Sequence, residues 1–225
     1  MGTDPLDDVR YAGYRRKLIE DIRARGIDDL EILQLFDRVP RHLFLPEGVQ
    51  PRAYEDNAIP IGYGQTASQP SLQAYYLTIL RPTKEDKVLE IGTGCGYLTA
   101  LLALMADRVY SVERIRELSK RSRKALDAFG VNNVALLVGD GTIGWRKYAP
   151  FDVIVVSAAS PSVPQALVDQ LADGGRMLIP VGSREIQELT LVQKTGFAVT
   201  EEVVGGDVKF VPLLGRFAWS EEGGP

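Results

Sequence analysis

Apolar residues recur in two alternating patterns between residues 71 and 181. Val88, Leu89 and Ile91 form a short apolar run of the kind found in buried strands, and similar runs recur along this stretch. The segments between these runs place apolar residues at helical spacing. The patterns predict helix 71–80, strand 87–91, helix 97–106, strand 108–112, helix 115–129, strand 133–138, strand 152–157, helix 163–171 and strand 175–181.

Strands that alternate with helices form parallel sheets, because each helix carries the chain back across the sheet. The end of the chain has strand-like runs without helices between them, which predict antiparallel strands over Leu189–Gln193, Ala198–Val204 and Phe210–Trp219. The predicted fold class is therefore α/β: a doubly wound, Rossmann-like, mostly parallel sheet with C-terminal antiparallel strands and an N-terminal helical extension.

The chain before this core divides into two parts. Residues 14–39 predict two short helices, since apolar residues recur at helical spacing on both sides of Gly26, and Asp28 and Asp29 suit a helix start. Residues 40–70 contain repeated prolines and glycines, which indicate a long functional loop. We predict a single structural domain, in which residues 1–70, the N-terminal helices and a substrate and active-site loop, pack on a cofactor-binding core of residues 71–220.

The composition narrows the function classes. The chain has 225 residues, of which 45% are hydrophobic, enough for one globular domain. A net charge of −4 gives no general attraction to nucleic acid or anionic membranes, so neither is expected as a partner. No apolar stretch approaches the ~20 residues that span a bilayer, and the N-terminus lacks a signal-peptide pattern. A soluble cytoplasmic protein is expected.

The single cysteine and the single histidine limit the chemistry. One cysteine excludes an intrachain disulfide, and one residue of each type leaves little material for a cysteine-rich or multi-histidine metal site, so no metal is predicted. Cys95 is expected to be a small loop residue, and His42 a packing or hydrogen-bonding residue, rather than catalysts.

A glycine-rich turn follows the first strand of the core. The stretch Val88-Leu-Glu-Ile-Gly-Thr-Gly-Cys-Gly96 has the pattern of a strand, a tight turn and a helix start, which binds nucleotide-like cofactors. Its G-x-G-x-G spacing differs from the G-x-G-x-x-G of dinucleotide sites, and Glu90 would repel a pyrophosphate. Both features favour S-adenosylmethionine over NAD.

Acidic residues follow the next two strands. Glu113 ends the second strand, near the distance from Gly92 at which a carboxylate accepts hydrogen bonds from a ribose diol. Asp140 and Gly141 follow the third strand, where an adenine amino group can be bound. Each acid alone also suits a helix start or a turn. The three strand ends together predict one cofactor site.

Several motifs outside the glycine turn carry a family resemblance. The chain from about Val39 to Trp219 resembles the protein-L-isoaspartate O-methyltransferase family. The turn alone indicates only a class I methyltransferase, whereas the Gly-Gln-Thr-x-Ser-x-Pro and Phe-Val-Pro-Leu elements are more specific. The motifs are Tyr54-Glu-Asp-Asn57, Pro60-Ile-Gly62, Gly64-Gln-Thr-Ala-Ser-Gln-Pro70, Val88-Leu-Glu-Ile-Gly-Thr-Gly94, Gly139-Asp-Gly141, Val163-Pro164, Gln170-Leu171, Gly174-Gly-Arg176, Ile179-Pro-Val-Gly182 and Phe210-Val-Pro-Leu213.

The resemblance implies a set of site residues. Ser68 matches the serine that the family places at its active site and is the predicted catalytic residue. Some members have a histidine-containing stretch where this chain has Ser71, Leu72 and Gln73. The predicted contacts of S-adenosylmethionine, or of its product S-adenosylhomocysteine, are Gln65, Thr66, Ala67, Ser68, Glu90, Gly92, Thr93, Gly94, Gly96, Glu113, Asp140 and Gly141. The predicted substrate contacts are Ile61, Thr66, Ser68, Val208, Phe210 and Val211.

The implied reaction is methyl transfer to the free α-carboxylate of an isoaspartyl residue, with damaged proteins and peptides as partners and repair through a succinimide as the result. A carboxylate is already ionised at neutral pH, so alignment and partial desolvation matter more than a base. A hydroxyl such as that of Ser68 can orient the carboxylate without quenching it.

Three other functions compete with this interpretation. They are methylation of another carboxylic acid, a non-catalytic scaffold that binds S-adenosylmethionine, and, less favoured, an NAD-dependent oxidoreductase. Residues 157–161 lack the Asn/Asp-Pro-Pro-aromatic pattern of many base methyltransferases, which argues against nucleic-acid methylation.

Overall fold

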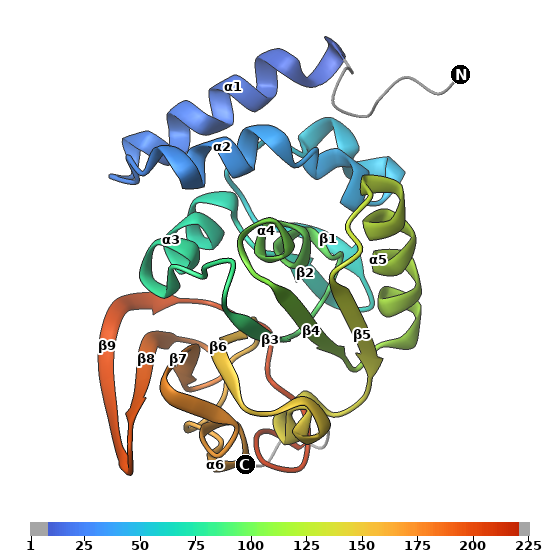
Figure 1. The fold of residues 1–225 in the computed structure, drawn as a ribbon. Helices are drawn as coiled ribbons and strands as arrows, with labels where there is room; N and C mark the ends of the chain where they lie inside the picture. Colours follow the sequence, from blue (N-terminus) through green and yellow to red (C-terminus); the bar gives the residue numbers. More distant parts are fainter. Residues whose placement is uncertain (1–8, 221–225) are drawn as a thin grey trace.

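A computed structural model of the chain describes residues 9–220. The centre of the described part is a seven-stranded sheet with strand order β5-β4-β3-β6-β7-β8-β9 (Figure 1). Of these seven strands, the first five along the chain pair in parallel, and the last two are antiparallel. The predicted α/β class is confirmed. The strands are β3 (Lys87–Ile91), β4 (Arg108–Glu113), β5 (Val134–Val138), β6 (Phe151–Val156), β7 (Leu171–Gly182), β8 (Gln187–Thr195) and β9 (Ala198–Val208).

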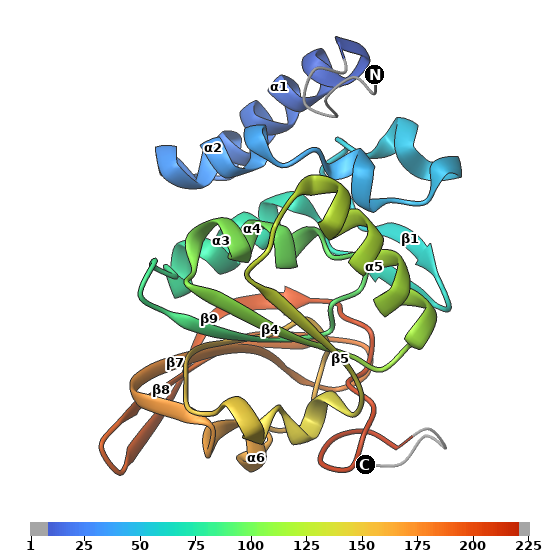
Figure 2. The same cartoon turned by 45° about the vertical axis from the view of Figure 1, so that its right-hand side comes forward.

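Helices cover the sheet on both faces. One face carries three helices, α3 (Pro70–Leu80), α4 (Tyr97–Met105) and α5 (Arg116–Phe129). The short helix α6 (Gln165–Val168) lies on the opposite face (Figure 2). This arrangement leaves the carboxyl ends of the parallel strands and the loops that follow them at one edge of the sheet, where ligands bind in open α/β folds.

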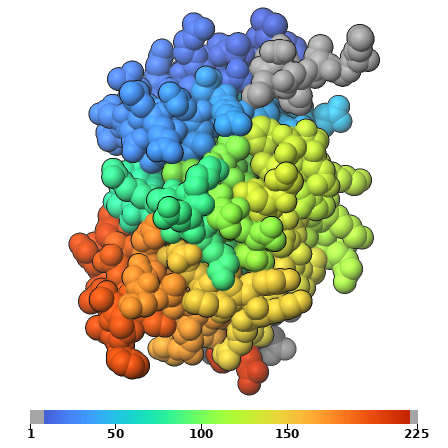
Figure 3. Space-filling view, viewed as in Figure 1, coloured from blue at the N-terminus to red at the C-terminus, as the bar shows by residue number. Residues whose placement is uncertain are grey.

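Two N-terminal helices form a further layer over α3 and α4. They are α1 (Val9–Ala24) and α2 (Leu30–Arg38), as the sequence predicts. Helix α2 begins at Asp29, whose carboxylate accepts hydrogen bonds from the backbone N–H groups of Glu31 and Ile32 and so satisfies two of the free donors of the first turn. The space-filling view shows these helices packed on the central part of the molecule (Figure 3).

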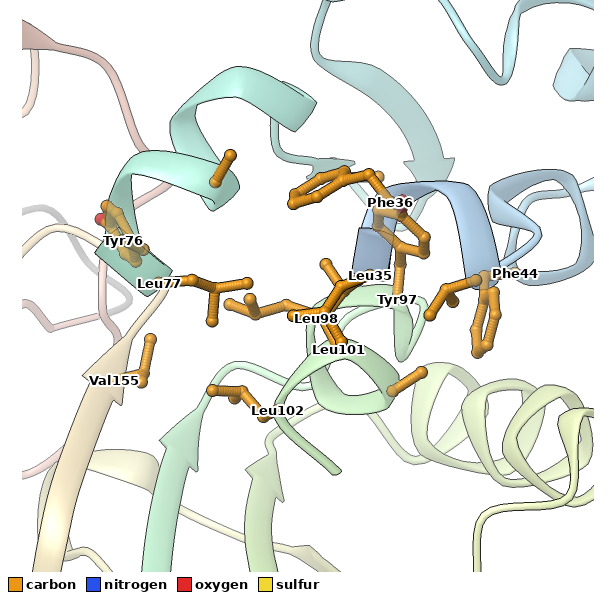
Figure 4. Close-up of a cluster of buried hydrophobic side chains, with 14 of the residues drawn as sticks. Leu35, Phe36, Phe44, Tyr76, Leu77, Tyr97, Leu98, Leu101, Leu102 and Val155 are labelled. Atoms are coloured by element: carbon orange, nitrogen blue, oxygen red, sulfur yellow. The ribbon is translucent and has the colours of Figure 1, made fainter. Parts of the chain in front are cut away.

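A hydrophobic core joins the N-terminal layer to the sheet. The buried cluster runs from Leu18 and Phe36 through the central helices to Val155 and Leu189. Tyr97 at the start of α4 meets the rings of Phe36 and Phe44 edge to face, with centroids 6.1 and 5.8 Å away. Figure 4 shows these rings beside the leucines of α4. The division of the chain at residue 70 stays a prediction.

Two predicted elements differ from the structure. Helix 163–171 is reduced to α6, because the chain must already pair Leu171 with Phe151 in the sheet. Residues Phe210–Trp219 form only isolated bridges rather than a strand. Pro212 within this segment has no N–H group and cannot take part in a regular ladder. The prediction of a third C-terminal strand was therefore wrong.

The segment 40–70 is more ordered than a long loop. It contains two 3₁₀ helices, Arg41–Phe44 and Glu47–Arg52, and a hairpin of β1 (Ile59–Gly62) and β2 (Gln65–Ala67). The hairpin leads directly into α3, so its second strand brings the predicted active-site stretch to the edge of the sheet. Over residues 9–220, no helix has the length and hydropathy that a membrane crossing needs.

Candidate active site

A cleft opens beyond the carboxyl ends of β3 and β4. The glycine turn after β3 forms its floor, and Gly92, Gly94 and Gly96 have φ values of 93°, 55° and 90°, which other residues rarely adopt. Nine of the predicted cofactor contacts line this cleft: Gln65, Thr66, Ala67, Ser68, Gly92, Thr93, Gly94, Glu113 and Gly141. Their roles as contacts stay predictions, but the fold brings them together from four separate parts of the chain.

Glu113 ties two loops of the cleft together. It is buried, with 6% of its surface exposed. One carboxylate oxygen accepts from the backbone N–H of Gly94 and the other from that of Ile115, both at 2.8 Å. Each carboxylate oxygen has a second lone pair, so the same group can still accept hydrogen bonds from a diol in the cleft.

Glu90 lies beneath the turn rather than in the cleft. Its side chain is fully buried, and Oε2 accepts hydrogen bonds from the hydroxyls of Thr99 and Ser111, both at 2.6 Å. The pKa of Glu90 is raised to about 7, mainly because burial desolvates the charged form. The two hydroxyl hydrogen bonds oppose this rise, and the nearby charge of Glu113 adds to it. In this position Glu90 links β3 to α4 and β4, and a direct cofactor contact stays a prediction.

Two further predicted contacts also lie outside the cleft lining. A Cβ atom at Gly96 would lie 3.0 Å from the Cβ of Ser122, so this glycine lets α4 approach α5. The carboxylate of Asp140 accepts hydrogen bonds from the backbone N–H of Thr142 and that of Arg216, both at 2.8 Å. Asp140 therefore connects the loop after β5 to the C-terminal segment, and its contact with adenine stays a prediction.

A buried arginine holds the backbone at Ser68. The guanidinium of Arg41 is fully buried and donates from Nη2 to the carbonyl oxygen of Ser68 at 2.9 Å. Nη1 donates to the carbonyl oxygens of Ala53 and Glu55 at 2.9 and 3.3 Å. Burial lowers the pKa of Arg41 below its usual value. The charges of nearby groups, of which Tyr97 has the largest effect, oppose this shift. The guanidinium also lies over the ring of Tyr97, 5.6 Å from its centroid.

Asp56 holds the residues that follow Ser68. One carboxylate oxygen of Asp56 accepts from the backbone N–H of Ser71 and the other from the amide of Gln69, both at 2.8 Å. The N-cap residue of α3 is Gln69, whose side chain makes no cap hydrogen bond. Arg41 and Asp56 thus fix the chain from the Ser68 carbonyl to Ser71, directly after the Ser68 side chain.

A second groove meets the cleft at Ser68. Its volume is about 420 Å³, and it contains five of the six predicted substrate contacts: Thr66, Ser68, Val208, Phe210 and Val211. The sixth, Ile61, is buried and lines neither cavity; its Cδ1 packs 3.4 Å from where a Cβ of Gly94 would lie. Thr66, Ser68, Ser157 and Val211 border both cavities. A group in the groove can therefore meet a group in the cleft beside Ser68.

Two residues near this junction were not among the site residues predicted from the sequence. Ser157 directly follows β6, at the same edge of the sheet as the glycine turn, and its place after a strand was the available signal. Gln73 lines the cleft from α3. No local pattern marks it, because its exposure depends on how α3 packs against the rest of the molecule.

The single histidine is hydrogen-bonded and stacked on an aromatic ring, and the single cysteine is buried. Nδ1 of His42 lies 2.9 Å from the hydroxyl of Tyr54, and its ring stacks on Tyr11 with centroids 4.1 Å apart. Cys95 is a buried residue of the glycine turn, and burial raises the pKa of its thiol, which disfavours a thiolate nucleophile. In the described part of the chain, no cluster of three or more His, Cys, Asp or Glu side chains could hold a metal ion.

Comparisons with known proteins agree with this geometry. Residues 14–218 match the family model described as protein-L-isoaspartate(D-aspartate) O-methyltransferase. The chain is 46% identical to the protein-L-isoaspartate O-methyltransferase of Dictyoglomus thermophilum over 98% of this chain and 100% of the relative. It is 49% identical to protein-L-isoaspartate O-methyltransferase 2 of Geotalea uraniireducens over 92% of this chain and 96% of the relative.

Solved structures show the same fold. A protein-L-isoaspartate O-methyltransferase superposes with a TM-score of 0.82 at 29% identity, over 91% of this chain and 67% of that one. A Plasmodium falciparum structure, described as a putative protein-L-isoaspartate O-methyltransferase in complex with S-adenosyl-L-homocysteine, superposes with a TM-score of 0.79 at 24% identity. That match covers 89% of this chain and 98% of the other.

Proposed function

Since this chain belongs to the protein-L-isoaspartate O-methyltransferase family, we propose that Ser68 orients the free α-carboxylate of an L-isoaspartyl residue for methylation by S-adenosylmethionine. The observation that carries the proposal is the position of Ser68 where the cleft and the groove meet. The acceptors are damaged proteins and peptides, and the methyl ester that results starts repair through a succinimide.

The residues of the cleft fit S-adenosylmethionine. Gly92 and Gly94 line the cleft without side chains, and Glu113 offers free lone pairs to a ribose diol. When bound, S-adenosylmethionine supplies an electrophilic methyl group on a sulfonium. The cofactor would be held by the glycine turn and by Gln65 to Ser68. The full set of cofactor contacts predicted from the sequence is our proposal for the site.

The groove fits an extended peptide. Val208, Phe210 and Val211 line the groove next to the end of the sheet's edge strand β9, and an extended peptide can bind beside an edge strand. The acceptor carboxylate is ionised at neutral pH and needs no base. Ser68 donates one hydrogen bond that sets its direction, and the surrounding residues remove part of its water shell.

A small carboxylic acid is the weaker alternative acceptor, because it would leave most of the groove unfilled. The deciding experiment uses labelled methyl donor and two peptides that differ only in an aspartyl or isoaspartyl linkage. We expect base-labile label in the isoaspartyl peptide alone. Labelling of small acids with neither peptide methylated would favour the alternative, and no transfer to any acceptor would favour a binding scaffold.

A further inference from the structure

Gln73 carries an unpaired polar atom at the wall of the active site. It lies in the first turns of α3 with 6% of its surface exposed, and its carboxamide oxygen Oε1 is buried without a hydrogen-bond partner in the described part of the chain. An unpaired buried polar atom is unfavourable by roughly 1–3 kcal/mol. The amide of Gln69, near it in the chain, is by contrast paired with Asp56.

Gln73 also borders the point where the two cavities meet. It lines the cleft, and it lines a narrow recess that it shares with Ser68 and Ser157. The other walls of this recess are apolar or aromatic and include Leu98 and Phe210. Such walls exclude water, so a hydrogen bond made to the carboxamide there is stronger than one on the surface.

We propose that Gln73 binds the isoaspartyl residue through both ends of its carboxamide. The NH₂ group donates to one oxygen of the acceptor α-carboxylate, and Oε1 accepts from the backbone N–H of the same residue. A primary amide presents a donor and an acceptor side by side, which matches an N–H and a carboxylate on one carbon atom. This inference rests on the proposed function and adds a second contact to that of Ser68.

The same pair of contacts distinguishes isoaspartate from aspartate. In an isoaspartyl residue the N–H and the free carboxylate are attached to the same α-carbon. In a normal aspartyl residue the free carboxylate is one methylene group farther away, and the α-carbon carries a peptide carbonyl instead. One carboxamide cannot reach both groups of the normal residue, so Gln73 is a specificity-determining residue.

The test combines a change in the enzyme with a change in the peptide. Gln73→Met keeps the size of the side chain and removes both polar atoms. A second peptide replaces the N–H of the isoaspartyl residue by an ester oxygen. For the unaltered enzyme, we expect this replacement to lower kcat/KM about 5- to 10-fold. For Gln73→Met, we expect a loss of about 10- to 100-fold with the normal peptide, and less than a twofold further loss with the ester.

Stability and cofactor binding separate this role from a structural one. Removal of an unpaired buried polar atom should leave the Tm of Gln73→Met unchanged or higher, and the Kd for S-adenosylhomocysteine should stay within about twofold. Gln73→Glu, which places a negative charge beside the acceptor carboxylate, should lower kcat/KM further than Gln73→Met. Thr78→Val, farther along α3, is the control and should leave kcat/KM unchanged, because its hydroxyl donates to the Ala74 carbonyl within the helix and Thr78 lines neither the cleft nor the groove.

Three results would overturn the inference. The first is an ester replacement that lowers kcat/KM equally in both enzymes, and the second is a Gln73→Met loss that is matched by an equal loss of S-adenosylhomocysteine affinity. The third is an unchanged kcat/KM in Gln73→Met while the unaltered enzyme still methylates isoaspartyl peptide. Failure of the unaltered enzyme to methylate that peptide would instead reject the proposed function.

Discussion

Nη2 of Arg41 donates a hydrogen bond to the carbonyl oxygen of Ser68, although 27 positions separate the two residues in the chain. The arginine lies in the 3₁₀ helix after α2, and the serine lies between β2 and α3. The same guanidinium also bonds to the carbonyl oxygens of Ala53 and Glu55. Arg41 therefore links the N-terminal segment to the backbone of the proposed catalytic serine.

Replacement of Arg41 should affect both stability and turnover. Lysine has a single ammonium group and cannot reach three carbonyl oxygens in the fork geometry of a guanidinium. We expect Arg41→Lys to lower the free energy of unfolding by about 3 kcal/mol and kcat about tenfold. Denaturant unfolding and steady-state kinetics measure the two effects. Arg52→Lys, at an exposed pair with Glu55, is the matched control. A stability loss with unchanged kcat would limit Arg41 to a structural role.

Ser68→Ala tests the hydroxyl itself. The backbone contact with Arg41 persists in this variant, so only the hydrogen bond to the acceptor is lost. We expect kcat/KM for an isoaspartyl peptide to fall about 10- to 100-fold, while the Kd of S-adenosylhomocysteine changes little. Peptide methylation assays and calorimetry provide the two values, with the exposed Ser162→Ala as control. An unchanged rate would remove Ser68 from the catalytic residues.

Glu113 should act mainly on cofactor binding. Glu113→Ala removes the proposed acceptors of the ribose diol and also the acceptors of the Gly94 and Ile115 N–H groups. We expect the Kd for S-adenosylhomocysteine to rise at least tenfold, measured by calorimetry. Glu113→Gln retains one acceptor oxygen, so its Kd for S-adenosylhomocysteine should lie between that of the unaltered chain and that of Glu113→Ala. If the alanine variant bound the product as tightly as the unaltered chain, the diol contact would be ruled out.

The buried Glu90 should make stability depend on pH. Its pKa is raised from 4.5 to about 7 by burial, so between these values the folded state binds a proton that the unfolded state has released. Its contribution to stability is therefore greatest below about pH 4.5, falls as the pH rises to about 7, and stays constant above.

Glu90→Gln cannot titrate and provides the comparison. Relative to this variant, the unaltered chain should lose about 3 kcal/mol of unfolding free energy across that window. Denaturant melts at several pH values measure the difference. A difference between the two proteins that does not vary with pH would show that Glu90 keeps an ordinary pKa.

The regular elements were predictable because each one repeats its apolar residues with the period of its own backbone. Strand β3 and helices α3 to α5 begin and end within one or two residues of the predicted positions. The errors arose where long-range pairing decides the structure. Leu171 joins the sheet and shortens α6, and the bridge between Ala159 and Pro212 holds a segment that resembles a strand.

The site shows the same division. The glycine turn and the acid after β4 were recognisable from their residue types and spacing, whereas the Ser68 stretch was recognisable through its resemblance to a family motif. Glu90 and Glu113 were both predicted to contact the cofactor, and only the structure places Glu90 in a buried contact with Thr99 and Glu113 in the lining of the cleft.

The sequence by itself determined the alternation of strands and helices from α3 to β6, the cofactor turn and the family to which the chain belongs. Only the tertiary structure decided that Arg41 reaches Ser68 and that the amide oxygen of Gln73 is left without a partner beside it. The physical reason is that the spacing of apolar residues along the chain indicates which side of a helix or strand is buried. The partner of a buried polar group, in contrast, depends on which distant segments meet when the chain folds.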